Sequence, residues 1–237
     1  MKRLFLTTVL AITAVFIITA CSKEDSNSAK TKISSTSAAN VEEPISIDPA
    51  LALKGKDLYN QNCVFCHQDD AIGKPGFAPS LTNQEFLAVS SDKFLMSTIR
   101  DGRGGTGMPP FAHLGRKQVE AIVAFLRGHA KHANISAQVD AEPQAQGDPR
   151  LGRFWFDSIC ATCHGPNGDG YSAGGTGTAI GKAGFLDKVS DGFIRETIKK
   201  GRSNTRMIGY EGPEAMAALT DQEVDDIIAY LRTVPSK

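Results

Sequence analysis

Two short runs of this 237-residue chain combine thiols with a histidine in the same pattern, Cys-x-x-Cys-His. They consist of Cys63, Cys66 and His67 in the first copy and Cys160, Cys163 and His164 in the second. This spacing is the attachment signature of c-type haem. Two thiols three positions apart, near the end of a helix, both reach the vinyl groups on one edge of a porphyrin. The next residue, histidine, then supplies an axial nitrogen to the iron. The sequence therefore predicts two covalently bound haem c groups.

Other chemistries of paired thiols fit this pattern less well. A redox dithiol does not need the histidine that follows each pair. A zinc site usually shows further Cys or His pairs at zinc spacing. A structural disulfide is the third alternative. Because the pattern occurs twice, each time inside a matching repeat, haem is favoured over all three.

The two motifs lie within copies of a longer repeat. The matched positions are Asp48-Pro49 with Asp148-Pro149, Gly55 with Gly152, Ser91-Asp92 with Ser190-Asp191, Phe94 with Phe193, Arg103 with Arg202, and Ala-Phe-Leu-Arg at 124–127 with Ala-Tyr-Leu-Arg at 229–232. A repeat that covers whole units means two copies of one domain. We place these domains at residues 48–130 and 148–237. The linker between them, 131–147, has little periodicity.

Within each copy, the apolar residues recur at the spacing of short helices. In the first copy we expect helices from 49 into the first cysteine, at 83–89, at 92–100 and at 118–127, with a non-helical Gly/Pro-rich stretch at 102–110. The fold class is therefore all-α. Each domain is small for a self-sufficient core, so we expect covalent haem to organise it. Gly55 and Gly152 are expected to let the first helix of each domain approach the last one closely.

The amino-terminal segment has the features of an export signal. A positive start is followed by an apolar run at 4–20 and then by Cys21, and the residues before that cysteine resemble the lipobox of bacterial lipoproteins. We expect 1–20 to be a lipoprotein signal peptide, Cys21 to carry lipid, and 21–47 to be a flexible tether. The alternative is a retained membrane anchor, since about 17 apolar residues lie at the bottom of the spanning range. The expected location is the bacterial cell envelope, lipid-anchored and facing the periplasm or the cell exterior.

The order of elements resembles that of class I cytochrome c: a helix, the Cys-x-x-Cys-His motif, an irregular loop, middle helices, a loop methionine and a closing helix. Two such domains in tandem resemble the dihaem carrier cytochromes of the bacterial periplasm. The resemblance implies that each domain wraps around one covalent haem, with His67 and His164 as axial ligands and a methionine opposite each.

Several residues take their expected roles from this resemblance. Met108 lies in Gly-Met-Pro-Pro-Phe, which matches the methionine loop of the family, and His113 is the competing ligand. The family often places a proline carbonyl on the other nitrogen of the axial histidine, and Pro79 fits that role for His67. The second domain has no proline at the matching place, so another carbonyl must orient His164.

The repeat register selects the second methionine. Met207 lies five residues after Arg202, as Met108 lies five residues after Arg103. The alternative, Met216, falls in or beside an insertion of six residues ahead of the closing helix. We therefore predict Met207 as the sixth ligand of the second haem.

With both axial positions filled by protein, no substrate reaches the iron without displacing a ligand, which favours electron transfer over catalysis. We expect transfer of single electrons between membrane-associated redox partners, and no enzymatic activity. One alternative is a dihaem enzyme of the peroxidase or thiosulfate-oxidising type. Another is a fixed electron-transfer subunit of a larger respiratory or molybdenum-enzyme complex.

The charge distribution bears on the partners. Lys and Arg total 26, as do Asp and Glu, so the formal net charge of zero gives no indication of nucleic-acid binding. Basic residues gather before the second methionine, at Arg195, Lys199, Lys200, Arg202 and Arg206. Such a run is either ordinary solvated surface or a patch that steers an acidic redox partner.

Overall fold

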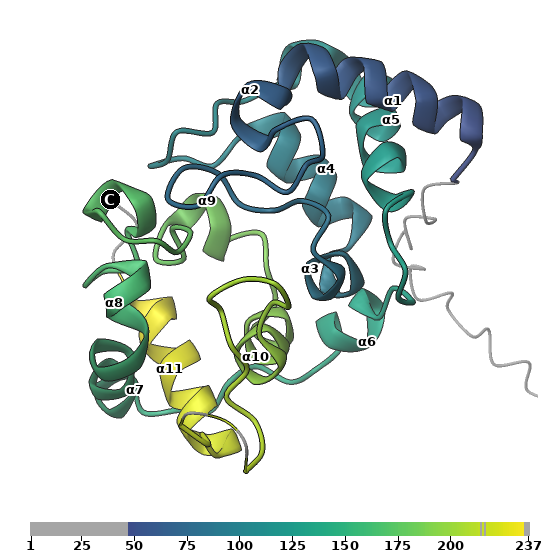
Figure 1. Cartoon of the computed structure of the whole chain (residues 1–237). Coiled ribbons are helices and arrows are strands. Elements are labelled where there is room, and N and C mark those ends of the chain that lie inside the picture. The colour runs from purple at the N-terminus through teal and green to yellow at the C-terminus, as the bar shows by residue number, and fades with distance from the viewer. Residues whose placement is uncertain (1–46, 214, 216, 235–237) are drawn as a thin grey trace, which may run out of the picture. The chain divides into compact units, whose positions relative to one another are not determined.

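The computed structural model describes residues 47–213, 215 and 217–234. The predicted signal peptide, Cys21, all but the last residue of the tether, and Met216 lie outside them. The described residues belong to one compact unit, 42–237. Their named elements are all helical, which confirms the all-α fold class (Figure 1). Within this described part, no helix is both long and apolar enough to cross a membrane.

The first half starts where the sequence predicts. Asp48 caps the first helix by accepting a hydrogen bond from the Ala50 amide, and Pro49 takes the first helical position. The elements of this half are α1 (Pro49–Asn62), α2 (Val64–His67), α3 (Gln84–Val89), α4 (Asp92–Asp101), the short 3₁₀ helix η1 (Ala112–Leu114) and α5 (Gly115–Arg127). Helix α5 begins earlier than the predicted residue 118, because η1 leads directly into it.

The second half repeats this order. Its elements are α7 (Pro149–Trp155), the π-helical turn η2 (Phe156–Cys160), α8 (Ala161–His164), the 3₁₀ helix η3 (Gly170–Ala173), α9 (Ala183–Leu186), α10 (Asp191–Lys200) and α11 (Asp221–Thr233). Asp148 caps α7 as Asp48 caps α1. The π-helical turn has no counterpart before the first motif. Turns of this kind are frequent at functional sites, and this one ends at the first cysteine of the second motif.

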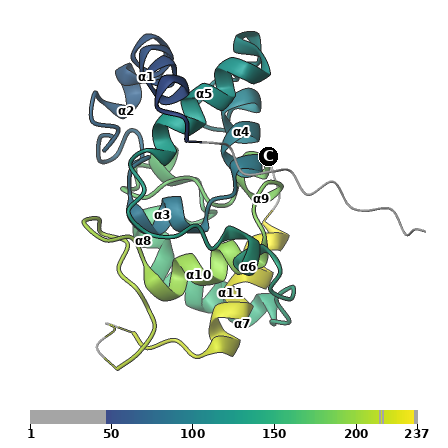
Figure 2. The same ribbon diagram turned by 90° about the vertical axis from the view of Figure 1, so that its right-hand side faces the viewer.

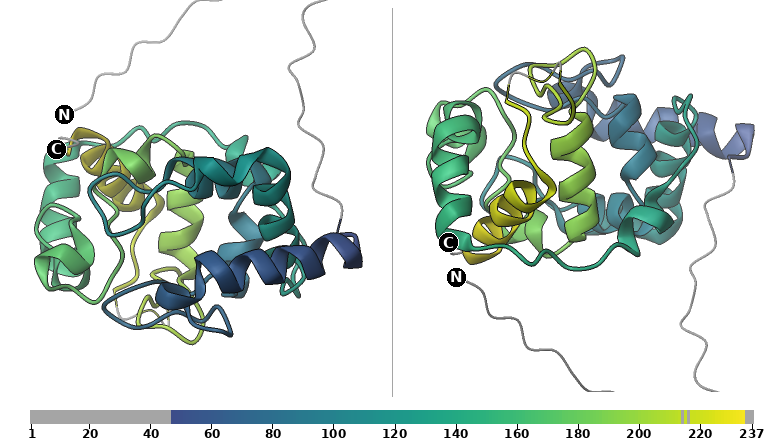
Figure 3. Two further views of the ribbon diagram at one scale, coloured as in Figure 1. Left: turned by 90° about the horizontal axis from the view of Figure 1, so that it is seen from above. Right: turned by 90° about the horizontal axis from the view of Figure 1, so that it is seen from below.

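In each half, the first helix packs against the closing one, α1 on α5 and α7 on α11 (Figure 3). A Cβ atom on Gly55 would overlap the Ala121 carbonyl, and one on Gly152 would overlap the Asp226 carbonyl. Glycine alone permits such an approach. The predicted close contact at both glycines is confirmed.

An aromatic pair seals each of these helix crossings. The ring centroids of Tyr59 and Phe125 lie 5.2 Å apart, and those of Phe156 and Tyr230 also lie 5.2 Å apart. Tyr59 and Phe156 are fully buried. Each haem motif begins four residues after one of these two aromatic residues and is therefore attached to a well-packed helix end.

An arginine near the end of each closing helix holds the middle of its own half. Arg127 pairs with Asp92 at 2.7 Å and donates to the carbonyls of Leu87 and Ser90. The second half repeats these bonds with Arg232, Asp191, and the carbonyls of Leu186 and Val189. Each closing helix is thus fixed to the helix that leads into the methionine loop.

The linker 131–147 between the halves contains regular structure. It contains α6 (Ser136–Asp140), where Val139 is only 3 % exposed. Farther along, the amides of Ala145 and Gln146 donate to the carboxylates of Asp191 and Asp225. This helix is too short to show a periodicity in the sequence, and it contacts both halves, through α3 and α10.

The halves meet along α3 and α10 (Figure 2). At the same boundary, the ring of Phe94 on α4 contacts that of Phe193 on α10, with centroids 5.3 Å apart. Beside them, the Glu85 carboxylate accepts hydrogen bonds from both the amide and the hydroxyl of Ser203, and Asn83 donates to the Ser203 carbonyl.

The contact between the halves follows the repeat, because positions that match in the repeat meet in both directions. In the repeat register Glu85 corresponds to Gly184, and Ser203 corresponds to Gly104. Those two glycines also meet, since a Cβ on Gly184 would lie 2.5 Å from the Gly104 amide nitrogen. Matching contacts in both directions are the mark of an isologous interface, usually found between identical subunits.

Candidate haem-binding sites

The four motif thiols are free and partly buried at the ends of their helices. Burial raises the pKa of Cys63 to about 11 and that of Cys160 to about 12, and the neighbouring thiol of each pair adds to the effect. The thiols of Cys63 and Cys160 are therefore neutral near pH 7, as is usual for buried cysteines.

Each motif histidine has one ring nitrogen bound to a backbone carbonyl. The Nδ1 atom of His67 lies 3.0 Å from the Pro79 oxygen, and Nδ1 of His164 lies 2.8 Å from the Thr178 oxygen. A carbonyl only accepts, so Nδ1 carries the proton and Nε2 keeps a lone pair for a metal. The predicted role of Pro79 is confirmed, and Thr178 supplies the carbonyl that the second domain needed.

Burial also holds both imidazoles neutral. It lowers the pKa of His67 and of His164, and the hydrogen bonds to the carbonyls of Pro79 and Thr178 offset only part of this effect. A neutral imidazole in a fixed orientation is the form that binds iron.

The two methionine loops have the same internal hydrogen bonds. The Met108 carbonyl accepts from the Arg103 amide at 3.1 Å, and the Met108 amide donates to the Thr106 hydroxyl at 3.2 Å. The Met207 carbonyl accepts from the Arg202 amide at 2.7 Å, and its amide donates to the Thr205 hydroxyl at 3.0 Å. The repeat thus extends through both loops without a gap, while the role of Met207 as a ligand stays a prediction.

The threonines in these loops were missed by the sequence reasoning. Each hydroxyl also donates to the carbonyl of the loop arginine at 2.7 Å. Thr106 and Thr205 therefore connect the arginine at the start of each loop to the methionine at its end. The signal was present as a threonine two residues before each methionine, in otherwise different loops.

Two residues were the alternatives to the predicted methionines, His113 to Met108 and Met216 to Met207. His113 is exposed on η1, with its ring centroid 6.0 Å from that of Phe111. Met216 lies outside the described residues.

A buried arginine tests whether this site fits a haem. The guanidinium of Arg103 contacts the Phe185 ring, and burial lowers its pKa to about 10. Its Nε atom has no hydrogen-bond partner among the described residues. A buried cation needs an anionic partner, and the propionates of a haem are carboxylates. The residues around the first methionine loop therefore fit the group that the motifs imply.

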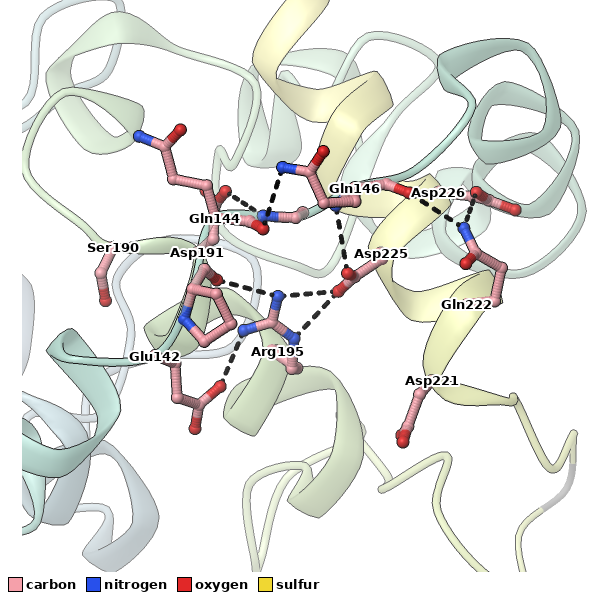
Figure 4. A network of polar contacts seen from close by, with 12 residues as sticks. Glu142, Gln144, Gln146, Ser190, Asp191, Arg195, Asp221, Gln222, Asp225 and Asp226 are labelled. Atoms are coloured by element: carbon pink, nitrogen blue, oxygen red, sulfur yellow. Dashed lines mark hydrogen bonds and ion pairs between the residues drawn. The ribbon is translucent and has the colours of Figure 1, made fainter. Parts of the chain in front are cut away.

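Three of the five basic residues that gather before the second methionine are paired with carboxylates. Arg195 pairs with Glu142 at 2.7 Å and with Asp225 at 2.8 Å (Figure 4). The remaining pairs are Lys199 with Asp221 and Lys200 with Glu211, both at 2.5 Å. Arg202 is largely buried, and Arg206 is exposed. The sequence could not show this pairing, because the acidic partners come from other elements.

Comparisons with known families match the two halves separately. Residues 50–126 match the family described as cytochrome c oxidase, cbb3-type, subunit III. Residues 150–235 match the cytochrome c family.

Similar whole proteins are respiratory subunits. The chain is 30 % identical over 198 residues to a cbb3-type cytochrome c oxidase subunit CcoP of Rubrivivax gelatinosus, covering 80 % of this chain and 56 % of that one. It is 28 % identical over 204 residues to a cytochrome bc1 complex cytochrome c subunit of Mycobacterium leprae, covering 78 % and 62 %. The chain thus spans little more than half of the first of these relatives.

A solved structure shares the fold. A chain of the Kuenenia stuttgartiensis reducing HAO-like protein complex Kustc0457/Kustc0458 aligns with a TM-score of 0.50 at 19 % identity, over 82 % of this chain and 99 % of that one. With both halves matched to cytochrome c families and a haem-attachment motif in each, the protein is a dihaem c-type cytochrome with two covalently bound haem c groups.

Proposed function

We propose that this protein transfers single electrons between membrane-associated redox partners through two His/Met-ligated haems. Cys63, Cys66, Cys160 and Cys163 attach the haems, and the ligand pairs are His67 with Met108 and His164 with Met207. The observation that carries the proposal is the identical hydrogen bonding of the two methionine loops. It holds each methionine backbone in the same way relative to its own domain.

The arrangement of the chain favours transfer over catalysis. A bound haem supplies an iron that changes oxidation state by one electron. His67 and His164, each oriented by a backbone carbonyl, and the methionines of the two loops would hold that group and leave no open position for a substrate. A thioether ligand favours the ferrous state and so raises the reduction potential. An enzyme of the peroxidase type would need an open or displaceable position instead.

The membrane attachment that we propose is a lipid on Cys21, with the folded domains on the periplasmic side. Several chains anchor a protein stably where one does not. The relatives named as subunits of cbb3-type oxidases and of a cytochrome bc1 complex favour a partner among respiratory membrane complexes. A fixed subunit of such a complex is the second candidate, and co-purification from detergent-solubilised membranes distinguishes it from a free carrier.

A spectroelectrochemical titration of the purified holoprotein tests the main proposal. We expect two one-electron transitions, together with the near-infrared band of iron–thioether ligation for both haems. The reduced protein should not bind carbon monoxide. Rapid carbon monoxide binding at either iron of the wild-type protein would contradict this proposal and support the enzyme alternative.

A further inference from the structure

The backbone of Arg103 belongs to the first domain, and its side chain reaches the second. Its backbone amide donates to the Met108 carbonyl at 3.1 Å, inside the first methionine loop. Its side chain reaches into the second domain, where Nη2 donates to the Ala179 carbonyl at 2.5 Å. The two ends of one residue are therefore bonded to the two candidate haem sites.

The far end of this connection lies next to the second axial histidine. Ala179 directly follows Thr178, whose carbonyl accepts the Nδ1 proton of His164 at 2.8 Å. A hydrogen bond to Ala179 thus fixes the peptide segment that orients this imidazole. Groups that hold an axial histidine in this way tune the metal that it binds.

The surroundings of the Arg103 guanidinium screen its positive charge only weakly. Its central carbon lies 4.8 Å from the centre of the Phe185 ring, which contributes a cation–π contact. Burial lowers its pKa to about 10, so it still carries a full charge near neutral pH. A charge in such a low-dielectric place is screened much less than one at the surface.

The matched residue of the second loop differs: among the described residues, it donates no hydrogen bond to the first domain, although the Glu85 carboxylate of that domain acts on its charge. Arg202 donates to the Thr197 hydroxyl at 2.6 Å and to the Gly201 carbonyl at 3.3 Å, both within its own domain. It is also largely buried, and burial lowers its pKa to about 10. The two arginines therefore differ in reach while they share burial, charge and position in the repeat.

We propose that Arg103 is a positioning residue through which the first domain sets the electron affinity of the haem in the second. Its side chain fixes the Thr178–Ala179 segment behind His164, and its buried charge favours the reduced state of the iron there. The inference rests on the proposed electron-transfer function. It gives Arg103 of the first domain an effect on the second haem that its repeat equivalent, Arg202, does not have on the first.

The decisive comparison is between Arg103→Gln and Arg202→Gln in the full-length holoprotein. Spectroelectrochemistry reports the ratio of oxidised to reduced haem at a fixed applied potential, and Met108→Ala and Met207→Ala assign the two transitions. For Arg103→Gln, we expect this ratio to rise at both haems, by about tenfold at the second, because a buried cation is lost. For Arg202→Gln, we expect a rise at the second haem alone.

A second readout follows the histidine itself. In the reduced protein, proton NMR measures the exchange of the His164 Nδ1 proton with solvent. We expect faster exchange in Arg103→Gln and an unchanged rate in Arg202→Gln, since of the two arginines Arg103 is the one that bonds to the residue next to Thr178. Arg103→Lys keeps the charge but not the planar fork, so it should speed exchange while the first haem changes by less than about twofold.

The proposal is overturned if Arg103→Gln changes only the first haem, or if His164 exchange is the same in all variants. If Arg103→Gln does not fold, Arg103→Lys decides by the exchange rate. Failure of the proposed function would look different, since the wild-type protein itself would then lack two one-electron transitions or the thioether band.

Discussion

Phe94 and Phe193 occupy the same position in the two repeats, three residues after the serine that caps their helices, and their rings contact each other across the domain boundary. The centroids lie 5.3 Å apart and the rings are tilted by 46°. A residue that touches its own repeat equivalent lies on the pseudo-twofold axis of the pair. This contact therefore marks the centre of the interface between the domains.

The first prediction concerns this pair. Phe94→Ala and Phe193→Ala should each lower the free energy of unfolding by about 3 kcal/mol. The double variant should lose less than the sum, with a coupling of about 1 kcal/mol. Guanidinium denaturation of the holoprotein measures these values. Phe154→Ala, at an exposed ring outside this contact, should combine additively with Phe94→Ala, and additivity of the central pair would refute the contact.

Replacing Met207 with Ala should remove one haem's share of the iron–thioether band, lower the potential of that haem and open its iron to carbon monoxide. A thioether stabilises ferrous iron, and its loss leaves a vacant position. Near-infrared absorption and carbon monoxide titration measure the effect. Met216→Ala is the matched control and should leave all three properties unchanged. The reverse pattern would show that the register of the repeat misassigns the ligand.

Loss of the second attachment site should unfold one domain and spare the other. Cys160→Ala combined with Cys163→Ala removes both thioether links, and a domain this small depends on the haem that organises it. Limited proteolysis with mass spectrometry should find cleavage within 148–234 and an intact first domain. Cys63→Ala with Cys66→Ala should give the mirror result. Wild-type resistance in both double variants would mean that the polypeptide cores suffice.

Arg127 should contribute far more to stability than an exposed arginine on the same helix. It is nearly buried, with 7 % of its side chain exposed, and it holds Asp92 and two carbonyls. Arg127→Met should lower the free energy of unfolding by about 3 kcal/mol, because it removes the ion pair with Asp92 and the two hydrogen bonds to the Leu87 and Ser90 carbonyls. Arg116→Met removes a surface pair with Glu120 on the same helix and should change it by less than about 1 kcal/mol. Equal effects of the two changes would contradict this reasoning.

The anchoring proposal predicts a defined amino terminus. Mass spectrometry of protein purified from native membranes should find Cys21 as the first residue, carrying acyl chains. A Cys21→Ser variant should appear in the soluble periplasmic fraction instead, because one thiol is the point of attachment. An unmodified Cys21, or a retained start of the chain, would exclude a lipoprotein.

The sequence predicted those features that depend on local spacing. The haem motifs, the Asp48 and Asp148 caps and the five-residue step from Arg202 to Met207 are all short-range patterns, and the repeat doubled each signal. The close approach at Gly55 was also predictable, because a glycine inside a helix needs a packing reason.

The features that were missed depend on residues far apart in the chain. The salt bridges of Arg195 join it to Glu142 and Asp225, which are 53 and 30 positions away. The reach of Arg103 to Ala179 spans 76 positions. No pattern in one sequence reports such distances, so the sequence could not show that Arg195, Lys199 and Lys200 are paired with carboxylates.

The isologous contact between the halves has a thermodynamic consequence. Two copies on separate chains would have to associate from dilute solution. Here the linker 131–147 joins the two domains, which gives each an effective concentration near the other on the order of millimolar. Interfaces of weak intrinsic affinity therefore stay closed when a single polypeptide carries both sides. Because the linker joins two different sequences, the two sides of the interface need not be identical. A dimer of one gene product must place the same arginine on both loops with the same bonds, whereas here Arg103 crosses the boundary and Arg202 does not. Covalent fusion is what permits a symmetric contact to carry a directional difference.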